Sequence, residues 1–158
     1  MKDGAILLVE DNADDVELTL RALTRQKISN DVTVMTDGQQ ALDYLFGAGE
    51  YVGRDTTKLP IVVLLDLNLP KVGGLEVLRS LRADARTKLL PVVILTSSKE
   101  ERDLIEGYSL GANSYVRKPV DFIEFAEAVR ILGVYWLLLN RPAPVPVPGE
   151  LTGGAVQF

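Results

Sequence analysis

The segment Ile61-Val62-Val63-Leu64-Leu65-Asp66 is an unbroken apolar run that ends in a carboxylate. A short continuous run of this kind, rich in β-branched side chains, favours a β-strand that is buried on both faces. Two further runs have the same character, Ile6-Leu7-Leu8-Val9 and Val92-Val93-Ile94-Leu95, and each is followed directly by polar side chains. Strands buried on both faces are typical of parallel sheets that carry helices on each side.

Helical patterns separate these strands, and the alternation predicts an α/β fold with five βα units and a mostly parallel sheet. The predicted strands are residues 5–9, 32–35, 61–65, 92–95 and 114–116. The predicted helices follow Asn12, begin at Asp37, cover 75–82, begin after Ser98 and cover 122–139. The chain has 158 residues, which is enough for one domain with its own hydrophobic core.

Side-chain chemistry predicts where three of the helices start. Asn12 is a suitable N-cap for the first helix. Asp37 with Gln40, and Ser98 with Glu101, show the capping-box spacing, in which an acid or amide follows the cap residue by three positions. The fourth helix, which follows Ser98, presents three large apolar side chains, those of Leu104, Ile105 and Tyr108.

The second half of the last predicted helix is apolar nearly all round. Beside the stripe that faces the core, a second apolar stripe contains Ile131, Val134, Tyr135 and Leu138. An exposed apolar patch on a small domain usually marks a partner surface, so we expect these residues to face a symmetric partner in a homodimer. The alternative is that the tail of the chain folds back over this face.

The tail, residues 140–158, differs in composition from the rest of the chain. Proline stands at every second position from 142 to 148, which excludes a helix. We therefore expect one domain over residues 1–139, followed by a Pro/Gly-rich tail that is extended or disordered.

Composition excludes several classes of function. The net charge is -5 and no run of Lys or Arg is present, so nucleic-acid binding is not expected. The absence of cysteine excludes thiol chemistry, and the absence of histidine excludes an imidazole base or ligand. The chain starts without a signal-peptide pattern and lacks an apolar stretch long enough to span a bilayer. We expect a cytoplasmic protein that is not bound to membranes.

The polar residues that follow the predicted strands define one site. In an open parallel α/β sheet, ligands bind outside the carboxyl ends of the strands. The side chains expected there are those of Glu10, Asp11, Asp66, Thr96 and Lys118. Three carboxylates at one edge repel each other unless a cation is present, and Mg²⁺ prefers such oxygen ligands. The sequence therefore predicts a Mg²⁺ site.

Phosphoryl chemistry fits this set of groups. An Asp carboxylate beside a metal can act as a nucleophile toward phosphorus and become an aspartyl phosphate. Asp66 is the candidate, because it ends the most apolar strand. Thr96 is placed to donate a hydrogen bond to one phosphoryl oxygen, and Lys118 to neutralise another.

These residues resemble the receiver domain of two-component response regulators over nearly the whole chain to about residue 139. The segments that carry the resemblance are 8–12, the acidic pair; 64–70, the phosphoacceptor; 95–97, the switch hydroxyl; and 115–119, the lysine and its proline. The resemblance implies a flavodoxin-like, doubly wound (βα)5 fold with strand order 2-1-3-4-5. It also implies a cis bond between Lys118 and Pro119. Residues 41–47 and the Tyr135-Trp136 pair are similar to single-domain regulators that work with phytochromes.

The resemblance also implies roles for individual residues. Asp66 is the phosphoacceptor, and Tyr115 is an aromatic switch that turns inward when Thr96 moves toward the phosphoryl group. The metal ligands are Asp11, the Asp66 side chain and the Asn68 backbone carbonyl, with Glu10 acting through water. The phosphoryl group comes from a sensor histidine kinase or a phosphotransfer protein. Such a domain is not a conventional enzyme, although it assists its own phosphorylation and dephosphorylation.

Two other functions use similar groups. A phosphatase of the haloacid dehalogenase type also has a nucleophilic Asp at a strand end, but it needs a second Asp two residues later, where this chain has Asn68. That family also places its acidic pair last, whereas Glu10 and Asp11 come first. The second alternative is an interaction module that keeps the fold without phosphorylation.

Overall fold

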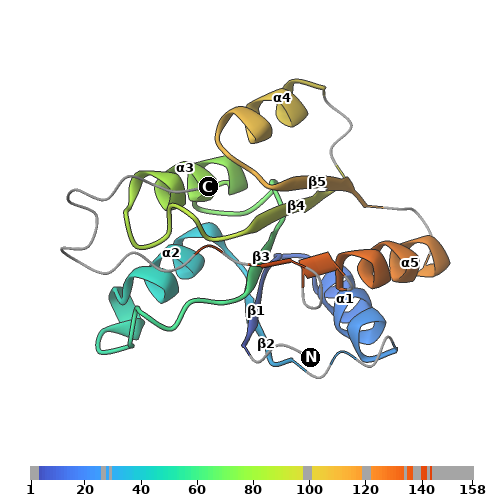
Figure 1. The fold of residues 1–158 in the computed structure, drawn as a ribbon, viewed down its shortest axis with the longest axis horizontal. Helices are drawn as coiled ribbons and strands as arrows, with labels where there is room; N and C mark the ends of the chain where they lie inside the picture. The colour runs from blue at the N-terminus through green and yellow to red at the C-terminus, as the bar shows by residue number, and fades with distance from the viewer. Residues whose placement is uncertain are drawn as a thin grey trace.

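Five parallel strands form one sheet in the order β2-β1-β3-β4-β5, which confirms the predicted fold class and strand order (Figure 1). The computed structural model describes residues 4–25, 28, 30–97, 101–118, 122–133, 135–136, 140–141 and 143. The strands are β1 (Ile6–Val9), β2 (Val32–Met35), β3 (Val62–Leu65), β4 (Val92–Thr96) and β5 (Ser114–Arg117). The helices are α1 (Ala13–Arg25), α2 (Gly38–Phe46), α3 (Gly74–Ala83), α4 (Glu101–Ser109) and α5 (Phe122–Gly133), with a short 3-10 helix η1 (Gly49–Tyr51).

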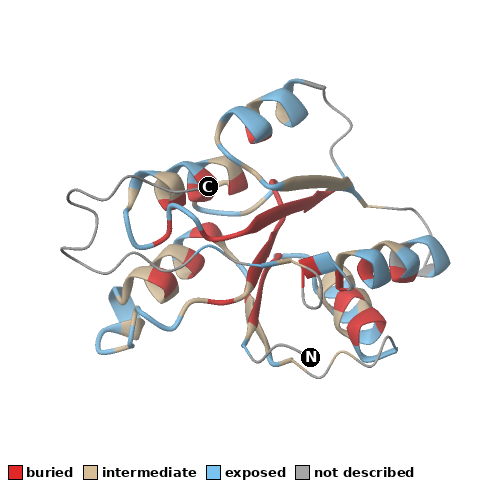
Figure 2. Ribbon diagram, in the orientation of Figure 1, coloured by how far each residue is buried: buried red, intermediate tan, exposed pale blue. Residues whose placement is uncertain are grey.

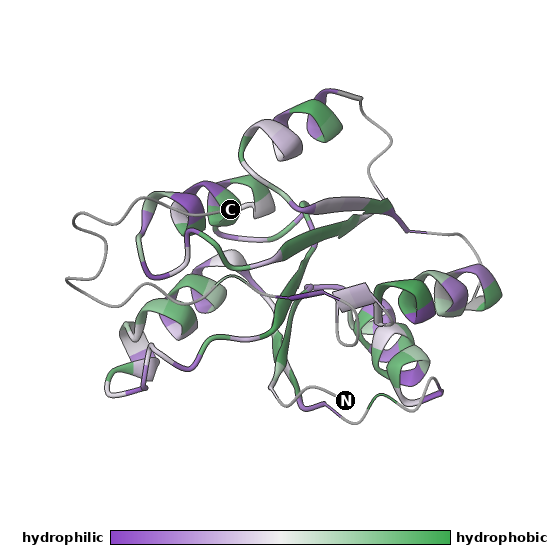
Figure 3. Ribbon diagram, viewed as in Figure 1, coloured by the Kyte–Doolittle hydropathy of each residue, from purple (hydrophilic) through white to green (hydrophobic). Residues whose placement is uncertain are grey.

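The helices cover both faces of the sheet. One core cluster contains α1 and α5 side chains against the sheet, and the other contains side chains of α2 and α3. In Figure 1, α1 and α5 lie side by side, while α2, α3 and α4 lie on the other side of the sheet. The central strands β1, β3 and β4 are buried along their whole length, and apart from Thr96 at the end of β4 their residues are hydrophobic (Figures 2 and 3). The edge strand β2 is only partly buried.

The predicted caps of α1 and α2 are present. The Asn12 side-chain oxygen accepts hydrogen bonds from the backbone N–H groups of Asp14, at 2.9 Å, and Asp15, at 3.1 Å. Asp37 Oδ1 accepts from the N–H of Gln40 at 2.7 Å. The Gln40 side chain reaches the N–H of Thr36 at 2.9 Å, one residue before the cap, so the capping box is extended by one position. Ser98, the predicted cap of α4, lies outside the described residues.

Helix α4 presents its apolar side chains to the surface. Leu104, Ile105 and Tyr108 are exposed, and the buried position of the helix is Gly107. A Cβ atom at Gly107 would lie 2.8 Å from Cδ1 of Ile94 in β4. The glycine therefore lets the helix backbone approach the sheet closely while the larger side chains remain outside.

The described part of the last helix is shorter than the predicted 122–139. Helix α5 ends at Gly133, and Tyr135 and Trp136 lie in a wider, π-type turn. Trp136 is buried against the core, whereas Tyr135 is exposed. Val134 and Leu138 of the predicted partner surface, and Pro119 of the predicted cis bond, lie outside the described residues. Among the helices of the described residues, none is long and apolar enough to cross a membrane.

Candidate functional site

The predicted site residues come together because four parallel strands end at the same edge of the sheet. The N–H of Glu10 donates to the Met35 carbonyl at 2.9 Å, which carries the chain beyond β1 in register with β2. The N–H of Asp66 donates to the carbonyl of Val9 at 3.0 Å. On the other side, the N–H of Lys118 donates to the carbonyl of Thr96 at 2.7 Å.

Lys118 lies at the centre of the site. Its ammonium forms ion pairs with Oε1 of Glu10, with Oδ2 of Asp15 at 2.8 Å and with Oδ2 of Asp66 at 3.6 Å. The side chains of Lys118, Glu10 and Asp66 are 9, 3 and 8% exposed. Charges this far from water interact strongly, so the position of the ammonium depends on the carboxylates around it.

Asp15 is a site residue that sequence reasoning missed. It is in the first turn of α1, three residues after the Asn12 cap, and its carboxylate contacts Lys118 from the helix. The available signal was its position: a residue in the first turn of a helix that follows the acidic pair starts at the same edge of the sheet. Asp14, its neighbour, is exposed, so the helix orientation decides which of the two acids contacts the lysine.

Glu10, Asp11 and Asp66 form an acidic cluster that could hold a cation. One carboxylate oxygen from each residue lies within 4.8 Å of the others. Oε2 of Glu10 is buried and has no hydrogen-bond partner among the described residues. An all-oxygen donor set with an unsatisfied buried oxygen is what Mg²⁺ or Mn²⁺ binds. These residues therefore fit a divalent metal.

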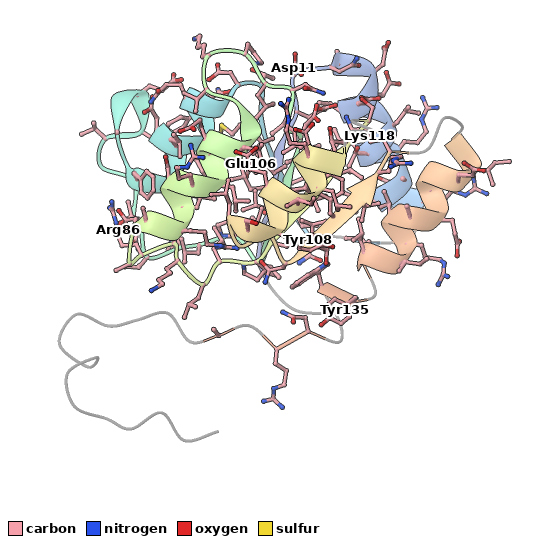
Figure 4. All side chains as sticks on the ribbon, turned by 90° about the horizontal axis from the view of Figure 1, so that it is seen from above. Asp11, Arg86, Glu106, Tyr108, Lys118 and Tyr135 are labelled. Atoms are coloured by element: carbon pink, nitrogen blue, oxygen red, sulfur yellow. The ribbon has the colours of Figure 1, made fainter. Side chains whose placement is uncertain are left out.

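The free space at the site shows on which side a cation fits. The cavity lined by Glu10, Asp66 and Lys118 has a volume of about 10 Å³, roughly the least that one water molecule needs. A hydrated cation does not fit there. Asp11, in contrast, is exposed (Figure 4), so the open side of the cluster is the side of Asp11.

The acidic groups have shifted pKa values. Burial and the adjacent Asp66 carboxyl raise the pKa of Glu10 to about 9. Burial alone would also raise the pKa of Asp66, but the hydrogen bond with Glu10 and the charge of Lys118 lower it below its ordinary value. Burial opposes the charge of Lys118, but the hydrogen bonds to Asp15 and Glu10 raise its pKa. Without a metal at neutral pH, Glu10 therefore holds a proton beside an ionised Asp66.

The two predicted switch residues lie on neighbouring strands. Thr96 is the last residue of β4 and is fully buried. Tyr115, in β5, pairs in register with Ile94, and its hydroxyl is buried. Its ring packs beneath α4, because a Cβ at Gly107 would lie 3.5 Å from Cδ2 of Tyr115. The ring of Tyr108 lies 6.4 Å away, so movement of Tyr115 changes the underside of α4.

The loop after Asp66 is shaped by close backbone contacts. Gly74 begins α3 and donates its N–H to the carbonyl of Leu67 at 3.0 Å. A Cβ at Gly74 would lie 2.2 Å from the carbonyl oxygen of Asp66, so only glycine fits there. Asn68, the remaining predicted ligand, is exposed in this loop, and its N–H contacts Oδ1 of Asp66 at 3.5 Å.

Comparison with known proteins identifies the family. A family model described as "Response regulator receiver domain" matches residues 6–130. The chain is 44% identical to the probable methanogenesis regulatory protein FilR2 of Methanothrix harundinacea over 140 residues, and this alignment covers 88% of each of the two chains. It is 36% identical over 132 residues to response regulator Rcp1 of Synechocystis, covering 84% of this chain and 88% of Rcp1.

Solved structures agree with the sequence matches. The phosphorylated cyanobacterial phytochrome response regulator RcpA has a TM-score of 0.81 and 35% identity, covering 92% of this chain and all (100%) of RcpA. The Mn²⁺-bound form of Rcp1 also has a TM-score of 0.81, with 34% identity, covering 89% of this chain and 99% of that one. A metal thus binds a relative that shares this fold.

These findings decide between the functions that the sequence left open. They favour neither a haloacid dehalogenase phosphatase nor an interaction module without phosphorylation, and they support a role in a phosphorelay. The acidic pair, the strand-end aspartate and the buried lysine occupy one edge of a five-stranded parallel sheet, as the fold requires. The chain belongs to the response regulator receiver family.

Proposed function

We propose that Asp66 accepts the phosphoryl group. The observation that carries this proposal is the position of Asp66: Lys118 Nζ lies 3.6 Å from its Oδ2, and Asp66 shares with Glu10 and Asp11 an acidic cluster that could hold a cation. A carboxylate between two positive charges can approach an anionic phosphoryl group without strong repulsion.

We further propose that the metal is Mg²⁺. Asp11, Asp66 and the backbone carbonyl of Asn68 would hold it, and Glu10 would contact it through water. Mg²⁺ keeps several waters and is usually held by one or two carboxylates, which suits a site with one exposed side. A bound Mg²⁺ neutralises the charge that develops on the phosphoryl oxygens.

The reaction is an in-line transfer from a phosphohistidine of the partner protein. An Asp66 carboxylate oxygen attacks phosphorus, the O–P bond forms and the P–N bond breaks. The leaving imidazole nitrogen takes up a proton from water. Lys118 orients one phosphoryl oxygen and the hydroxyl of buried Thr96 donates to another, so the chain assists its own phosphorylation and later hydrolysis without being a conventional enzyme.

The switch couples this chemistry to the surface of α4. Thr96 moves toward the phosphoryl group, and Tyr115 fills the space that Thr96 leaves. Because the Tyr115 ring packs beneath Gly107, its movement alters the face that carries Leu104, Ile105 and Tyr108. The phosphorylation state is thus read as a change in the α4 surface.

The partners follow from the chemistry and from the relatives. The donor is a sensor histidine kinase or a phosphotransfer protein, and a phytochrome-type kinase is the first to test, because RcpA is a phytochrome response regulator. The proposed receiver domain comprises residues 1–139 and acts in the cytoplasm without binding nucleic acid, and residues 140–158 are the Pro/Gly-rich tail, for which the sequence predicts an extended or disordered chain.

A homodimer would form through the exposed apolar part of α5 and the residues that follow. Ile131 is 55% and Tyr135 49% exposed, and the sequence predicts that Val134 and Leu138 complete this partner surface. Sedimentation at roughly tens of micromolar protein tests this part, because a monomer at that concentration contradicts it.

Phosphorylation by a small-molecule donor tests the central proposal. Incubation with acetyl phosphate and Mg²⁺ should add one phosphoryl group per chain, measured by intact mass, and peptide mapping should place it on Asp66. Asp66→Asn should abolish the addition. Asp84→Asn is the matched control, because Asp84 pairs with Arg86 far from the site and should leave the addition unchanged. Addition that persists in Asp66→Asn would show that another residue is the acceptor.

A further inference from the structure

The amino end of the sheet, opposite the phosphoacceptor, carries two adjoining grooves. The larger has a volume of about 810 Å³ and the smaller about 480 Å³. Both are lined by Leu89, Pro91 and Ala143. The grooves are therefore continuous across the residues that precede β4, and Ala143 lies where they meet.

The larger groove has apolar and aromatic walls. Leu59, Pro60 and Ile61 come from the segment before β3, and Leu89 and Leu90 from the segment before β4. Leu89 is 53% exposed, so its side chain is open to an occupant of the groove.

An aromatic side chain forms part of the wall of this groove. Tyr44 lines the groove, and the guanidinium of Arg54 lies 3.9 Å from the centre of its ring. Arg54 also donates to the backbone carbonyls of Tyr44 and Lys58, at 3.0 and 2.7 Å, so the wall is held in place before anything binds. Preformed aromatic-lined grooves are what extended proline-rich segments bind.

The chain itself leads into the groove after α5. The N–H of Asn140 donates to the carbonyl of Tyr135 at 2.6 Å, which turns the backbone at the end of the helix. Trp136, Asn140 and Arg141 line the smaller groove, and Ala143 reaches the larger one. The next residues in sequence are Pro144-Val145-Pro146-Val147-Pro148.

We propose that residues 144–148 occupy the larger groove as an extended, polyproline-type segment of the same chain. Five residues in this conformation span about 15 Å, at 3.1 Å per residue. Proline has no N–H to leave unsatisfied against an apolar wall, and its restricted backbone loses little entropy on binding. The leucine-rich wall would cover the apolar proline and valine side chains of this segment.

Charge favours the same occupant. The cationic side chains that line the groove are Arg54, Lys58 and Arg86, against one acidic side chain, Asp55. After Arg141 the sequence has a single charged residue, Glu150, which follows the proposed segment directly beyond Gly149. An acidic residue at the end of the docked segment meets a basic rim at short range.

Disulfide trapping tests the proposal in the full chain, which has no cysteine of its own. One variant combines Thr57→Cys with Val145→Cys, and the control combines Lys88→Cys with Val145→Cys. Both residues are exposed, and Thr57 lines only the larger groove whereas Lys88 lines only the smaller one, so each lies beside one of the two grooves that meet at Ala143. Circular dichroism of the reduced variants checks the fold.

Mild oxidation should crosslink the Thr57 pair within one chain at least about tenfold faster than the Lys88 pair, because docking raises the local concentration of the two thiols. Equal rates, or a faster Lys88 pair, would overturn the proposal, since an undocked tail that leaves Ala143 is free to approach both grooves. A crosslink that joins two chains would also overturn it, because the occupant would then be the tail of a second copy.

Discussion

Two cationic side chains that are at least partly buried lie at opposite ends of the sheet, and the groups around them differ in kind. At the carboxyl end, Lys118 is surrounded by carboxylates. At the amino end, Arg82 of α3 donates to neutral oxygens: to the carbonyl of Gly111 at 2.8 Å, to that of Leu90 at 2.8 Å and to Oδ1 of Asn113 at 3.0 Å. Figure 4 shows the separation of the two ends, with Asp11 and Lys118 on one side and Arg86 and Tyr135 on the other.

The contrast is between acceptors of Lys118 that can change their charge and acceptors of Arg82 that cannot. Carboxylates around Lys118 can exchange a proton, a metal ion or a phosphoryl group, so the position of the ammonium changes with each. Backbone carbonyls around Arg82 cannot change their charge, and the planar guanidinium fork holds several of them at once. The same fold thus keeps one end rigid and the other responsive.

The largest effect expected is that of Lys118→Gln on phosphorylation. Removing the ammonium removes a charge that stabilises the transferring phosphoryl group, and loss of one such group costs about 10²- to 10³-fold in rate. The rate of phosphorylation by acetyl phosphate in saturating Mg²⁺ measures it. Lys71→Gln is the control at the same end, because Lys71 is 70% exposed and lies 3.7 Å from Asp37. An equal loss of phosphorylation rate in both variants would mean that Lys118 has no specific role in the transfer.

Mg²⁺ should stabilise the protein through the carboxyl end alone. At a concentration 100 times Kd, a ligand that binds only the folded state adds about 2.7 kcal/mol to the free energy of unfolding. Denaturant unfolding with Mg²⁺ and with a chelator measures the difference. Asp11→Asn should remove most of it, while Asp84→Asn at the amino end should keep it. An unchanged Mg²⁺ effect in Asp11→Asn would place the metal elsewhere.

Arg82→Met should lower stability without changing phosphorylation chemistry. It removes the donor to the carbonyls of Gly111 and Leu90, which costs about 2 kcal/mol in the free energy of unfolding, while Asn113 Oδ1 still accepts from the N–H of Val92. Urea unfolding measures the loss, and Arg79→Met is the control, because Arg79 lies on the same helix and forms an exposed pair with Glu76. A stability loss no larger than that of the control would mean that the hydrogen bonds of Arg82 do not stabilise the amino end of the sheet.

In the absence of metal, Glu10 at the carboxyl end should make the stability of the protein depend on pH. The pKa of Glu10 rises from an ordinary 4.5 to about 9, so between these values the folded protein holds a proton that the unfolded chain has released. Stability therefore falls as pH rises from about 5 toward 9, by at most about 1.4 kcal/mol per pH unit. Glu10→Gln should flatten urea-unfolding stability between pH 6 and 8 in chelator. A wild-type protein that is equally stable at both pH values would contradict this assignment.

Much of the fold and the site follows from local patterns in the sequence. The strands were predictable to within one residue at each end, because apolar runs such as 62–65 stop at a polar residue. Asp66 and Thr96 were predictable as neighbours because parallel strands end at one edge. Gly47 ends α2 with a left-handed backbone (φ 67°), the conformation that favours glycine after a helix.

The parts that sequence reasoning missed depend on the three-dimensional packing of helices. Asp15 contacts Lys118 only because α1 is rotated so that Asp15, and not Asp14, faces the sheet. Arg82 has acceptors 5 to 31 positions away in sequence, and no local pattern indicates such contacts. The exposure of Ile105 and Tyr108 follows from the close approach of Gly107 to β4, which an apolar pattern alone does not indicate.

A crystal structure of the protein with Mg²⁺ and beryllium fluoride, a stable phosphoryl analogue, tests the central claim most directly. The prediction is that the analogue is bound to Asp66, that Lys118 Nζ has left Asp15 for a fluorine of the analogue, and that Arg82 keeps its hydrogen bonds to Gly111 and Leu90. A Lys118 that still pairs with Glu10 and Asp15, or an analogue bound away from Asp66, would contradict the account.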